Sequence, residues 1–269
     1  TDLDGITLEP LASANAVLSN EEKEAGVALI DIGGGTTDLA IFKDGIIRHT
    51  AVIPFGGNVI TEDIKEGCSI IEKQAELLKV KFGSAWPGEN KENEIVSIPG
   101  LRGRDPKEIS LKNLSKIINA RTVEIIEQVY LEIKNYGHEE QKKKLIAGIV
   151  LTGGGSQLKH LKQLVEFVTG MDTRVGYPNE HLAGDTDKNV TSPLYATAVG
   201  LVMDGLSKIE KNNIENTEFE NSDDESEVSE TTVENNSEEI EKRTEKKIKR
   251  ESFLDKLTKN LQDFLDNAE

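Results

Sequence analysis

The chain has 269 residues, 36% of them hydrophobic and 4% aromatic, and a formal net charge of −17 at pH 7. The acidic balance argues against nucleic acid as a partner, and the single cysteine, Cys68, excludes an internal disulfide and suits a reducing compartment. No apolar run approaches the length of a transmembrane helix, and no signal peptide is visible.

The first predicted element is a helix at Leu8–Leu18, built mostly of small residues that allow close packing against a neighbour. Glu9 falls in its first turn, where the positive end of the helix dipole favours an acid. From the residues alone, Glu9 is an ordinary first-turn acid, and a functional role needs further support.

Residues 27–42 contain two short apolar, strand-like runs joined by a hairpin of glycines and threonines. Successive glycines allow positive φ angles and bring backbone N–H groups against a ligand, an arrangement that suits a phosphate. Asp31, at the end of the first run, is placed to hold a hydrated Mg²⁺, because this cation keeps several waters and binds through one or two carboxylates. The alternative is a plain glycine-rich hairpin with a surface aspartate. The candidate residues of this hairpin are Asp31, Gly33, Gly34, Gly35, Thr36 and Thr37.

A second glycine loop follows the hairpin. Lys43-Asp44-Gly45 is predicted as a turn and Ile46–Ile53 as a third strand, which together give a meander. Pro54-Phe55-Gly56-Gly57-Asn58 then opens a helix at Val59–Lys65. The alternative for this loop is an ordinary connection between a strand and a helix.

Residues 69–82 form another helical pattern, in which Glu76 and Lys79 lie three residues apart on one side. Such a pair is ordinarily a weak salt bridge on the surface. The residue types alone therefore assign no function to it.

A long helix is predicted from Leu111 to Tyr136, after a short strand at Ile95–Ile98 and a turn at Asp105-Pro106-Lys107. Apolar residues at near-helical spacing make its buried stripe, and charged residues cover its other face. A charged face is ordinarily only solvated. This face carries Lys112, Lys116, Arg121, Glu124 and Glu127.

A third glycine cluster follows a buried-strand run at Ile146–Leu151 and precedes an amphipathic, helical pattern from Leu158 to Val168. The junction predicts a helix N-terminus where a nucleotide can bind. It has neither the lysine of a P-loop nor the spacing of the dinucleotide fingerprint, so neither of those folds is indicated. Its candidate residues are Gly153, Gly154, Gly155, Ser156 and Gln157.

The end of the chain has a different composition. Residues 208–241 carry thirteen Asp or Glu and two Lys, a net charge of −11, and such a segment is predicted to be a disordered linker. A basic cluster at 242–250 then precedes six apolar residues that fall within about 120° of arc on a helix. This pattern favours an anionic membrane surface, and the alternative is docking on protein. The apolar residues are Phe253, Leu254, Leu257, Leu261, Phe264 and Leu265.

Four segments together resemble a known family. DIGGGTTDLAIF (31–42) and IVLTGGGSQL (149–158) look like the phosphate and adenosine motifs of the actin-like ATPases. RHTAVIPFGGNVIT (48–61) and SPLYATAVGL (192–201) are similar to segments of the FtsA family of bacterial cell-division actin homologues. The likeness covers roughly residues 5–206.

The resemblance implies ATP and Mg²⁺ as cofactors, with at most weak ATPase activity. It implies that the first two glycine segments hold the phosphates and that the third is the adenosine motif. It also implies that Asp31 organises the metal through water and that Glu76 and Lys79 reach the ribose and adenine. Hydrolysis would be Mg-assisted attack of water on the γ-phosphate, with the water oriented by Glu9 or Thr37. The resemblance also implies that Gly56, Gly57 and Asn58 of the second loop bind the nucleotide.

The resemblance also implies partners. The long helix matches the part of the family that receives the C-terminal tail peptide of FtsZ, and Arg121 and Glu124 are its predicted contacts. Further expected partners are other copies of the protein in a homopolymer and anionic lipids. The implied protein is an ATP-binding adaptor that ties FtsZ filaments to the cytoplasmic face of the cell membrane at the division site.

We expect a two-layered α/β fold of the actin-like type, mainly its second lobe with subdomains IIA and IIB. The chain begins inside the family's first connecting helix, so we expect the N-terminal half to be absent and the chain alone to bind nucleotide weakly. Alternatives are another actin-like ATPase of the rod-shape or chaperone type, or a sugar or acetate kinase lobe. The predicted parts are a remnant of the first lobe (1–25), subdomain IIA (26–66 and 146–206), subdomain IIB (67–145), a linker (207–250) and an amphipathic helix (251–269).

Overall fold

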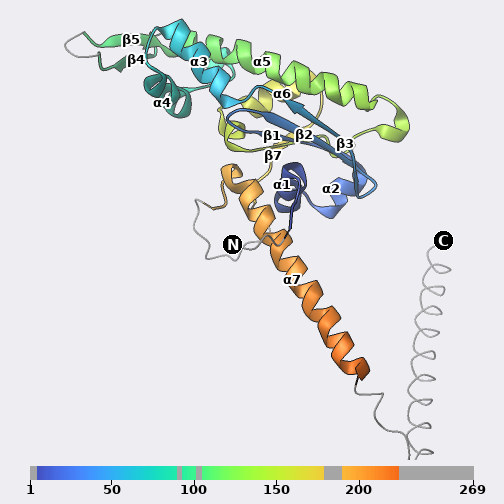
Figure 1. The fold of residues 1–269 in the computed structure, drawn as a ribbon. Helices are drawn as coiled ribbons and strands as arrows, with labels where there is room; N and C mark the ends of the chain where they lie inside the picture. Colours follow the sequence, from blue (N-terminus) through green and yellow to red (C-terminus); the bar gives the residue numbers. More distant parts are fainter. Residues whose placement is uncertain (1–4, 90–92, 101–104, 179–189, 224–269) are drawn as a thin grey trace, which may run out of the picture. The chain divides into compact units, whose positions relative to one another are not determined.

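A computed structural model describes residues 5–89, 93–100, 105–178 and 190–223 (Figure 1). The chain divides into two compact units, 1–211 and 212–269, and the functional residues discussed below belong to the first. The helices and strands are α1 (Glu9–Val17), α2 (Asn20–Ala25), β1 (Val27–Ile32), β2 (Thr37–Lys43), β3 (Ile46–Ile53), α3 (Gly57–Cys68), α4 (Glu72–Phe82), β4 (Ile95–Ile98), β5 (Lys107–Ser110), α5 (Leu111–Tyr136), β6 (Ile149–Thr152), α6 (Leu161–Thr169), β7 (Thr173–Val175) and α7 (Ala196–Asp223). Short 3₁₀ segments are η1 (Pro87–Glu89), η2 (Gln141–Lys143), η3 (Gly154–Gln157) and η4 (Pro193–Tyr195).

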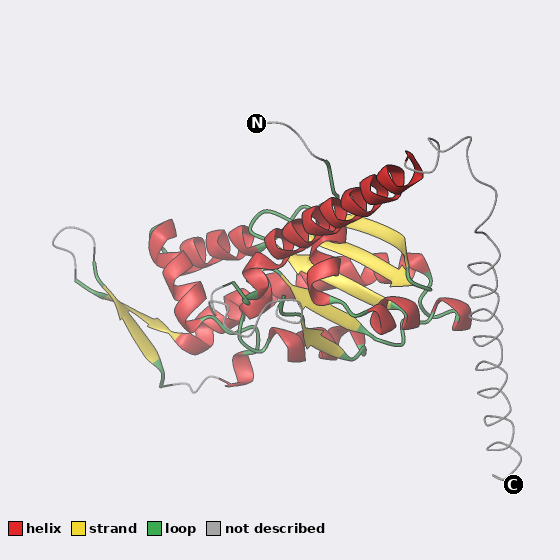
Figure 2. Ribbon diagram, turned by 90° about the horizontal axis from the view of Figure 1, so that it is seen from below, coloured by secondary structure: helices red, strands yellow, loops and turns green. Residues whose placement is uncertain are grey.

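A five-stranded sheet in the order β3-β2-β1-β6-β7 forms the centre of the first unit (Figure 2). β1 pairs antiparallel with β2 and parallel with β6, and β6 pairs parallel with β7. The register places Asp31 opposite Asp38 on one side and Thr152 on the other. The glycine segments that follow β1 and β6 therefore leave the sheet at the same edge.

Helices cover both faces of this sheet. β1 is buried along its whole length because its alternate side chains enter different cores. Ala28 and Ile30 pack with residues of α5 and α6, whereas Val27 and Leu29 pack with residues of α1 and α7 (Figure 1). The unit therefore has three layers, and the expectation of two layers was wrong. Strands that are apolar on both faces need a cover on both sides.

The residues between β3 and β6 carry a further core of their own. This third core is built from α3, α4, the β4–β5 hairpin and the first half of α5. The second half of α5 packs on the sheet instead, through Ile126, Val129 and Ile133. The boundaries of subdomains IIA and IIB remain predictions, but α5 is shared between two cores rather than belonging to one.

Several element boundaries differ from the predicted ones. α3 begins at Gly57, two residues earlier than predicted. Ser69 adopts a left-handed conformation (φ 49°) that ends α3, and the next helix, α4, begins only at Glu72. Lys107 begins a strand that pairs with β4, where a turn was expected. α6 begins at Leu161, after the 3₁₀ segment η3, so no α-helix starts directly at the third glycine cluster.

α7 continues to Asp223, inside the segment predicted to be a disordered linker. The helix therefore ends later than expected, and the remainder of the predicted linker lies outside the described residues. The predicted amphipathic helix at 251–269 also lies outside them. Within the described part of the chain, no helix is both long and apolar enough to cross a membrane.

Candidate nucleotide-binding site

A cavity of about 640 Å³ opens at the edge of the sheet where β1 and β6 end. All three predicted glycine segments contribute to its wall, together with an apolar side formed by α5 and Leu158. The predicted site residues that line it are Glu9, Asp31, Gly33, Gly34, Gly57, Asn58, Glu76, Lys79, Gly153, Gly154, Gly155 and Gln157. The sequence thus identified most of the polar lining.

The first and second glycine loops are joined by backbone hydrogen bonds. The N–H of Gly57 donates to the carbonyl of Gly33 at 2.9 Å, and the N–H of Asn58 donates to that of Gly34 at 2.8 Å. A Cβ on Gly56 would lie 2.6 Å from the Gly33 carbonyl oxygen, so this close approach requires glycine. Gly34 lines the cavity, and no acceptor for its N–H lies among the described residues.

Asp31 is buried at the end of β1, with only 7% of its surface exposed. Its Oδ2 accepts a hydrogen bond from Ser13 at 2.8 Å and one from Thr197 at 3.5 Å. Burial raises the pKa of Asp31, the hydrogen bond from Ser13 opposes that rise, and nearby Asp38 adds to it. Oδ1 lies beside Gly153, whose φ of +80° and close contact leave no room for a Cβ.

These groups fit a metal-bound nucleotide. A fixed carboxylate next to glycine N–H groups offers the single hard oxygen ligand that hydrated Mg²⁺ prefers, beside donors for phosphate oxygens. Within the described residues, no three His, Cys, Asp or Glu side chains are grouped so that they could hold a metal ion.

The two predicted water-orienting residues lie in different places. Glu9 lines the cavity, and burial, followed by the charges of Asp38 and Asp31, raises its pKa. Thr37 is fully buried, does not line the cavity, and donates its hydroxyl hydrogen to the carbonyl of Phe55 at 2.8 Å. Thr37 therefore holds the second loop, and its role toward water remains a prediction.

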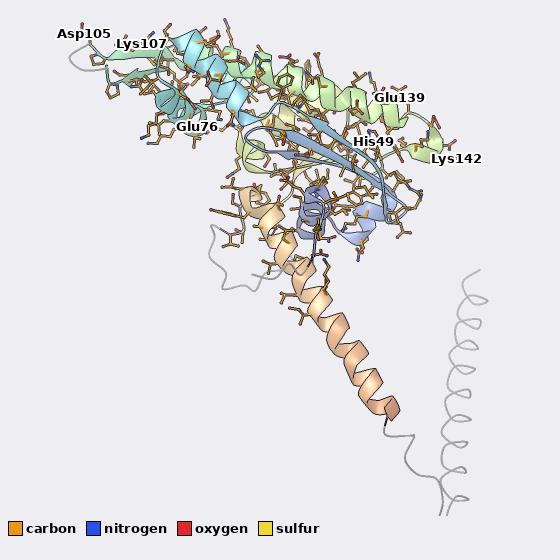
Figure 3. The ribbon with its side chains drawn as sticks, in the orientation of Figure 1. His49, Glu76, Asp105, Lys107, Glu139 and Lys142 are labelled. Carbon is orange, nitrogen blue, oxygen red and sulfur yellow. The ribbon has the colours of Figure 1, made fainter. Side chains whose placement is uncertain are left out.

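Glu76 and Lys79 lie on α4 at the cavity wall, and Figure 3 labels Glu76 on this helix. The Lys79 ammonium lies 2.8 Å from the Glu76 carboxylate. Burial alone would raise the pKa of Glu76, but hydrogen bonds from Lys79 and Thr61 outweigh it and lower the pKa. Glu76 is thus a carboxylate held in a network at the cavity, and its contact with ribose remains a prediction.

Residues 28–200 match the family model for "Cell division protein FtsA". The chain belongs to the FtsA family. It is 42% identical over 207 residues to cell division protein FtsA of Pseudomonas aeruginosa. The aligned region covers 77% of this chain and 48% of that protein. It is 36% identical over 220 residues to cell division protein FtsA of Escherichia coli K12, and this match covers 78% of this chain and 52% of that protein. The chain spans about half the length of the curated FtsA relatives it matches.

Solved structures with the same fold are actin-like ATPases, as the family membership requires. MreB5 of Spiroplasma citri bound to ADP aligns with a TM-score of 0.60 at 27% identity, over 78% of this chain and 62% of that one. The PilM–PilN complex of type IV pilus biogenesis aligns with a TM-score of 0.57 at 19% identity, over 75% of this chain and 53% of that one. The mixed α/β fold of this FtsA-family chain is therefore the predicted actin-like fold.

Some residues expected at the nucleotide site of the FtsA-family chain shape its loops without lining the cavity. Ser156 is buried and donates to the carbonyl of Gly153 at 2.7 Å, and Thr36 donates to Asp38 at 3.0 Å. The predicted residues outside the lining are Gly35, Thr36, Thr37, Gly56 and Ser156. Sequence reasoning missed Ser13 and Thr197, which reach Asp31 from α1 and α7. Thr197 lies inside one of the FtsA-like segments, but its proximity to Asp31 is visible only in the fold.

Arg121 and Glu124, the residues predicted to contact the FtsZ peptide, occupy a different part of the unit on α5. The Arg121 guanidinium donates to Asp63 of α3 at 2.6 and 3.0 Å and to Glu124 at 2.7 Å. The hydrogen bonds from Arg121 to Asp63 raise the pKa of Arg121. Its contact with a partner remains a prediction, and such a partner would compete with carboxylates of the chain itself.

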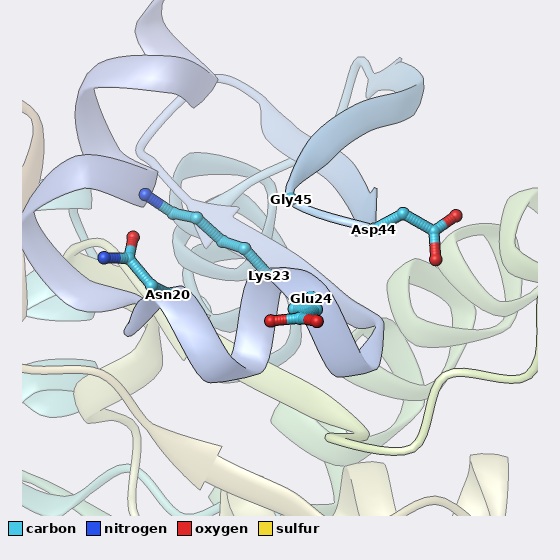
Figure 4. A pocket seen from close by; sticks show the side chains of 5 residues that line it. All are labelled: Asn20, Lys23, Glu24, Asp44 and Gly45. Carbon is cyan, nitrogen blue, oxygen red and sulfur yellow. The ribbon is translucent and has the colours of Figure 1, made fainter. Parts of the chain in front are cut away.

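A second, smaller hollow lies between α2 and the turn that joins β2 to β3 (Figure 4). It is lined by Asn20, Lys23, Glu24, Asp44 and Gly45. The ammonium of Lys23 is 3.2 Å from Asn15, and the Asp44 side chain points away from Lys23. Its charged groups do not converge, so we assign no ligand to this hollow.

Proposed function

We propose that the whole protein binds Mg-ATP in the cavity at the edge of the sheet. The observation that carries the proposal is the convergence of three glycine segments and the buried Asp31 carboxylate on one cavity with an apolar wall. The volume, about 640 Å³, falls in the usual range for a small-molecule site. The likeness to MreB5 of S. citri, whose structures were solved with ADP and with AMPPNP, supports the choice of ligand.

In this proposal, different residues of the chain contact the phosphates, the metal and the attacking water. Glycine N–H groups, including that of Gly34, bind phosphate oxygens, and Asp31 orients the waters of the metal. Bound Mg-ATP supplies an activated γ-phosphoryl group for transfer to water. Glu9 orients that water and accepts its proton, for which a raised pKa is useful because a proton acceptor works best near the ambient pH.

At the level of the whole protein, we propose an adaptor that polymerises and connects FtsZ filaments to the cytoplasmic face of the membrane at the division site. Membership of the FtsA family supports the division role. The α5 surface around Arg121 is the proposed site for the FtsZ tail, and the amphipathic C-terminal sequence is the proposed membrane contact.

Calorimetry of Mg-ATP binding to the whole protein tests the nucleotide site. We expect Asp31→Ala to weaken Mg-ATP binding at least tenfold and to have a smaller effect on ATP without the metal, because the carboxylate acts through the cation. Asp44→Ala, at the opposite end of β2, is the matched control and should leave the affinity unchanged. Equal Mg-ATP affinity in the wild type and Asp31→Ala, with both folded, would defeat the proposal.

A further inference from the structure

Ser13 holds the carboxylate of Asp31 from a position outside the cavity. Its hydroxyl donates a hydrogen bond to Asp31 Oδ2 at 2.8 Å. Ser13 is fully buried in α1 and does not line the cavity, whereas Asp31 does. A ligand in the cavity therefore reaches Asp31 but not Ser13, and any effect of Ser13 on the ligand passes through this carboxylate.

Thr197 supports Ser13 from the beginning of α7. Its Oγ1 lies 2.9 Å from Ser13 Oγ and 3.5 Å from Asp31 Oδ2. A hydroxyl has a single O–H donor, and Ser13 gives its own to Asp31, so Thr197 is the donor in the contact between the two hydroxyls. A chain of hydrogen bonds thus runs from α7 through α1 to the end of β1.

The two hydroxyls meet because α1 and α7 pack closely on one face of the sheet (Figure 1). A Cβ on Gly200 would overlap the carbonyl oxygen of Ala12, the residue before Ser13. Thr197 precedes Gly200 by three residues on α7, a spacing that places both on the same face of the helix. The glycine therefore allows the close approach that brings Thr197 to Ser13.

We infer that Ser13 is a positioning residue for the carboxylate that organises the metal, with Thr197 as its support. This inference rests on the proposed nucleotide site. Ser13 fixes Oδ2 of Asp31, and Oδ1, beside Gly153 of the cavity wall, is the oxygen offered to the waters of the cation. Side chains that orient a metal-binding group in this way contribute to metal affinity without touching the metal.

Calorimetry of the whole protein with and without Mg²⁺ tests this role. We expect Ser13→Ala to weaken Mg-ATP about fivefold and ATP with EDTA less than about twofold, because the hydroxyl acts only through Asp31 and the cation. Alanine suits the interior of α1, so the substitution removes the hydrogen bond without opposing the helix. Ser115→Ala, at another fully buried serine in a helix, is the matched control and should leave both affinities unchanged.

Thr197 provides a second variant on a different helix. Thr197→Val removes the hydroxyl at nearly constant volume and should cause part of the same Mg²⁺-dependent loss, and Thr197→Ser, which restores the hydroxyl, should recover it. Thr197 also lines the cavity, so the double variant is needed to exclude a direct contact with the ligand. If Thr197 acts through Ser13, Thr197→Val adds little to the loss in Ser13→Ala.

The result for Asp31→Ala separates this inference from the proposed function. Equal Mg-ATP affinity in the wild type and Asp31→Ala, or no binding by the wild type, overturns the nucleotide site and the role of Ser13 with it. If Asp31→Ala weakens Mg-ATP but Ser13→Ala does not, or if Ser13→Ala loses equally with and without Mg²⁺, only the positioning role is overturned. A loss in Ser13→Ala that requires Mg²⁺ and disappears in the Asp31→Ala background supports it. If Ser13→Ala does not fold, the same comparison between Thr197→Val and Thr197→Ser decides.

Discussion

Side chains around the cavity fall into two groups, those that face it and those that hold its loops. Asp31 and Glu9 face the cavity, whereas Thr37 is buried and fixes the second loop through Phe55. Lys79 lies in the cavity wall and donates to Gly57 and Thr61. Residue type alone does not separate these groups, because a hydroxyl or an ammonium serves equally well in either.

Arg121 is the residue whose proposed partner contact is easiest to test. We expect Arg121→Glu to weaken binding of an FtsZ tail peptide by more than the ~1 kcal/mol typical of an exposed ion pair. The physical reason is that the substitution removes a guanidinium held in one orientation by Asp63 and Glu124 and puts a negative charge in its place. Fluorescence anisotropy of a labelled peptide measures this loss.

Lys162→Glu provides the control for charge reversal, because Lys162 forms an exposed pair with Glu166 on α6. Thermal unfolding of both variants shows whether the loss of the Asp63 contact has disturbed the fold. If a folded Arg121→Glu variant binds the peptide as the wild type does, Arg121 only joins α5 to α3.

At the scale of elements, α2 is fixed by a carboxylate that serves two purposes. Glu22 completes a capping box, in which Ser19 Oγ accepts from the Glu22 N–H at 3.2 Å and Glu22 accepts from the Ser19 N–H at 2.9 Å. The same carboxylate receives two hydrogen bonds from Arg174 of β7, both at 2.6 Å. One side chain thus caps a helix and ties it to the edge strand of the sheet.

We expect Glu22→Gln to lower the free energy of unfolding by about 1.5–3 kcal/mol at pH 7, the range for hydrogen bonds to charged groups. Burial would raise the pKa of Glu22, but the hydrogen bonds from Arg174 and Ser19 outweigh it and lower the pKa. The stabilisation is therefore present above the ordinary glutamate pKa and is lost as the pH falls through the lowered value. Denaturant unfolding at several pH values measures this change.

The difference between wild type and Glu22→Gln should shrink below that pH window, because protonated glutamate resembles glutamine. Glu24→Gln, an exposed change on the same helix, should have little effect at any pH. A Glu22→Gln variant with unaltered stability at pH 7 would contradict the role of the Arg174 contact.

At the scale of the whole molecule, the chain joins a compact unit to a long C-terminal segment of different composition. Six large apolar side chains at roughly 1.5–3 kcal/mol each offer on the order of 10 kcal/mol before the cost of ordering a helix. Because interfacial burial is partial and a short helix is costly to form, one such segment should bind a membrane reversibly. Polymerisation would gather many segments into one array and strengthen the attachment.

The double substitution Leu257→Glu with Leu261→Glu should release the whole protein from anionic vesicles and leave ATP binding intact. It places two charges in the middle of the predicted apolar face, where they oppose burial. Ser252→Glu with Gln262→Glu adds the same charge outside that face and should reduce flotation much less. A Leu257→Glu, Leu261→Glu protein that still floats with the vesicles docks on protein, and the membrane interpretation is then wrong.

The local sequence pattern determined the glycine loops and several helix and strand boundaries of this protein. Glycine clusters after apolar runs placed the three loops of the cavity, because such loops need positive φ angles or close backbone approach. The strands at Ile46–Ile53 and Ile95–Ile98 and the helix at Leu111–Tyr136 have the predicted bounds, since periodicity and turn residues act over a few positions. The same segments carried the resemblance to the FtsA family, which the comparisons confirmed.

Only the tertiary structure decided which of those residues line the cavity. β5 and β7 were not predicted, and each is a short strand that pairs with a neighbour, β5 with β4 and β7 with β6. The hydrogen bond between Thr197 and Asp31 joins residues 166 positions apart. Lys79 donates hydrogen bonds to two residues of another helix, Gly57 and Thr61. Burial and hydrogen-bond partners are properties of neighbours in space, so the structure gives the surroundings of Thr37, Asp31 and Lys79 where the sequence offers only their identity.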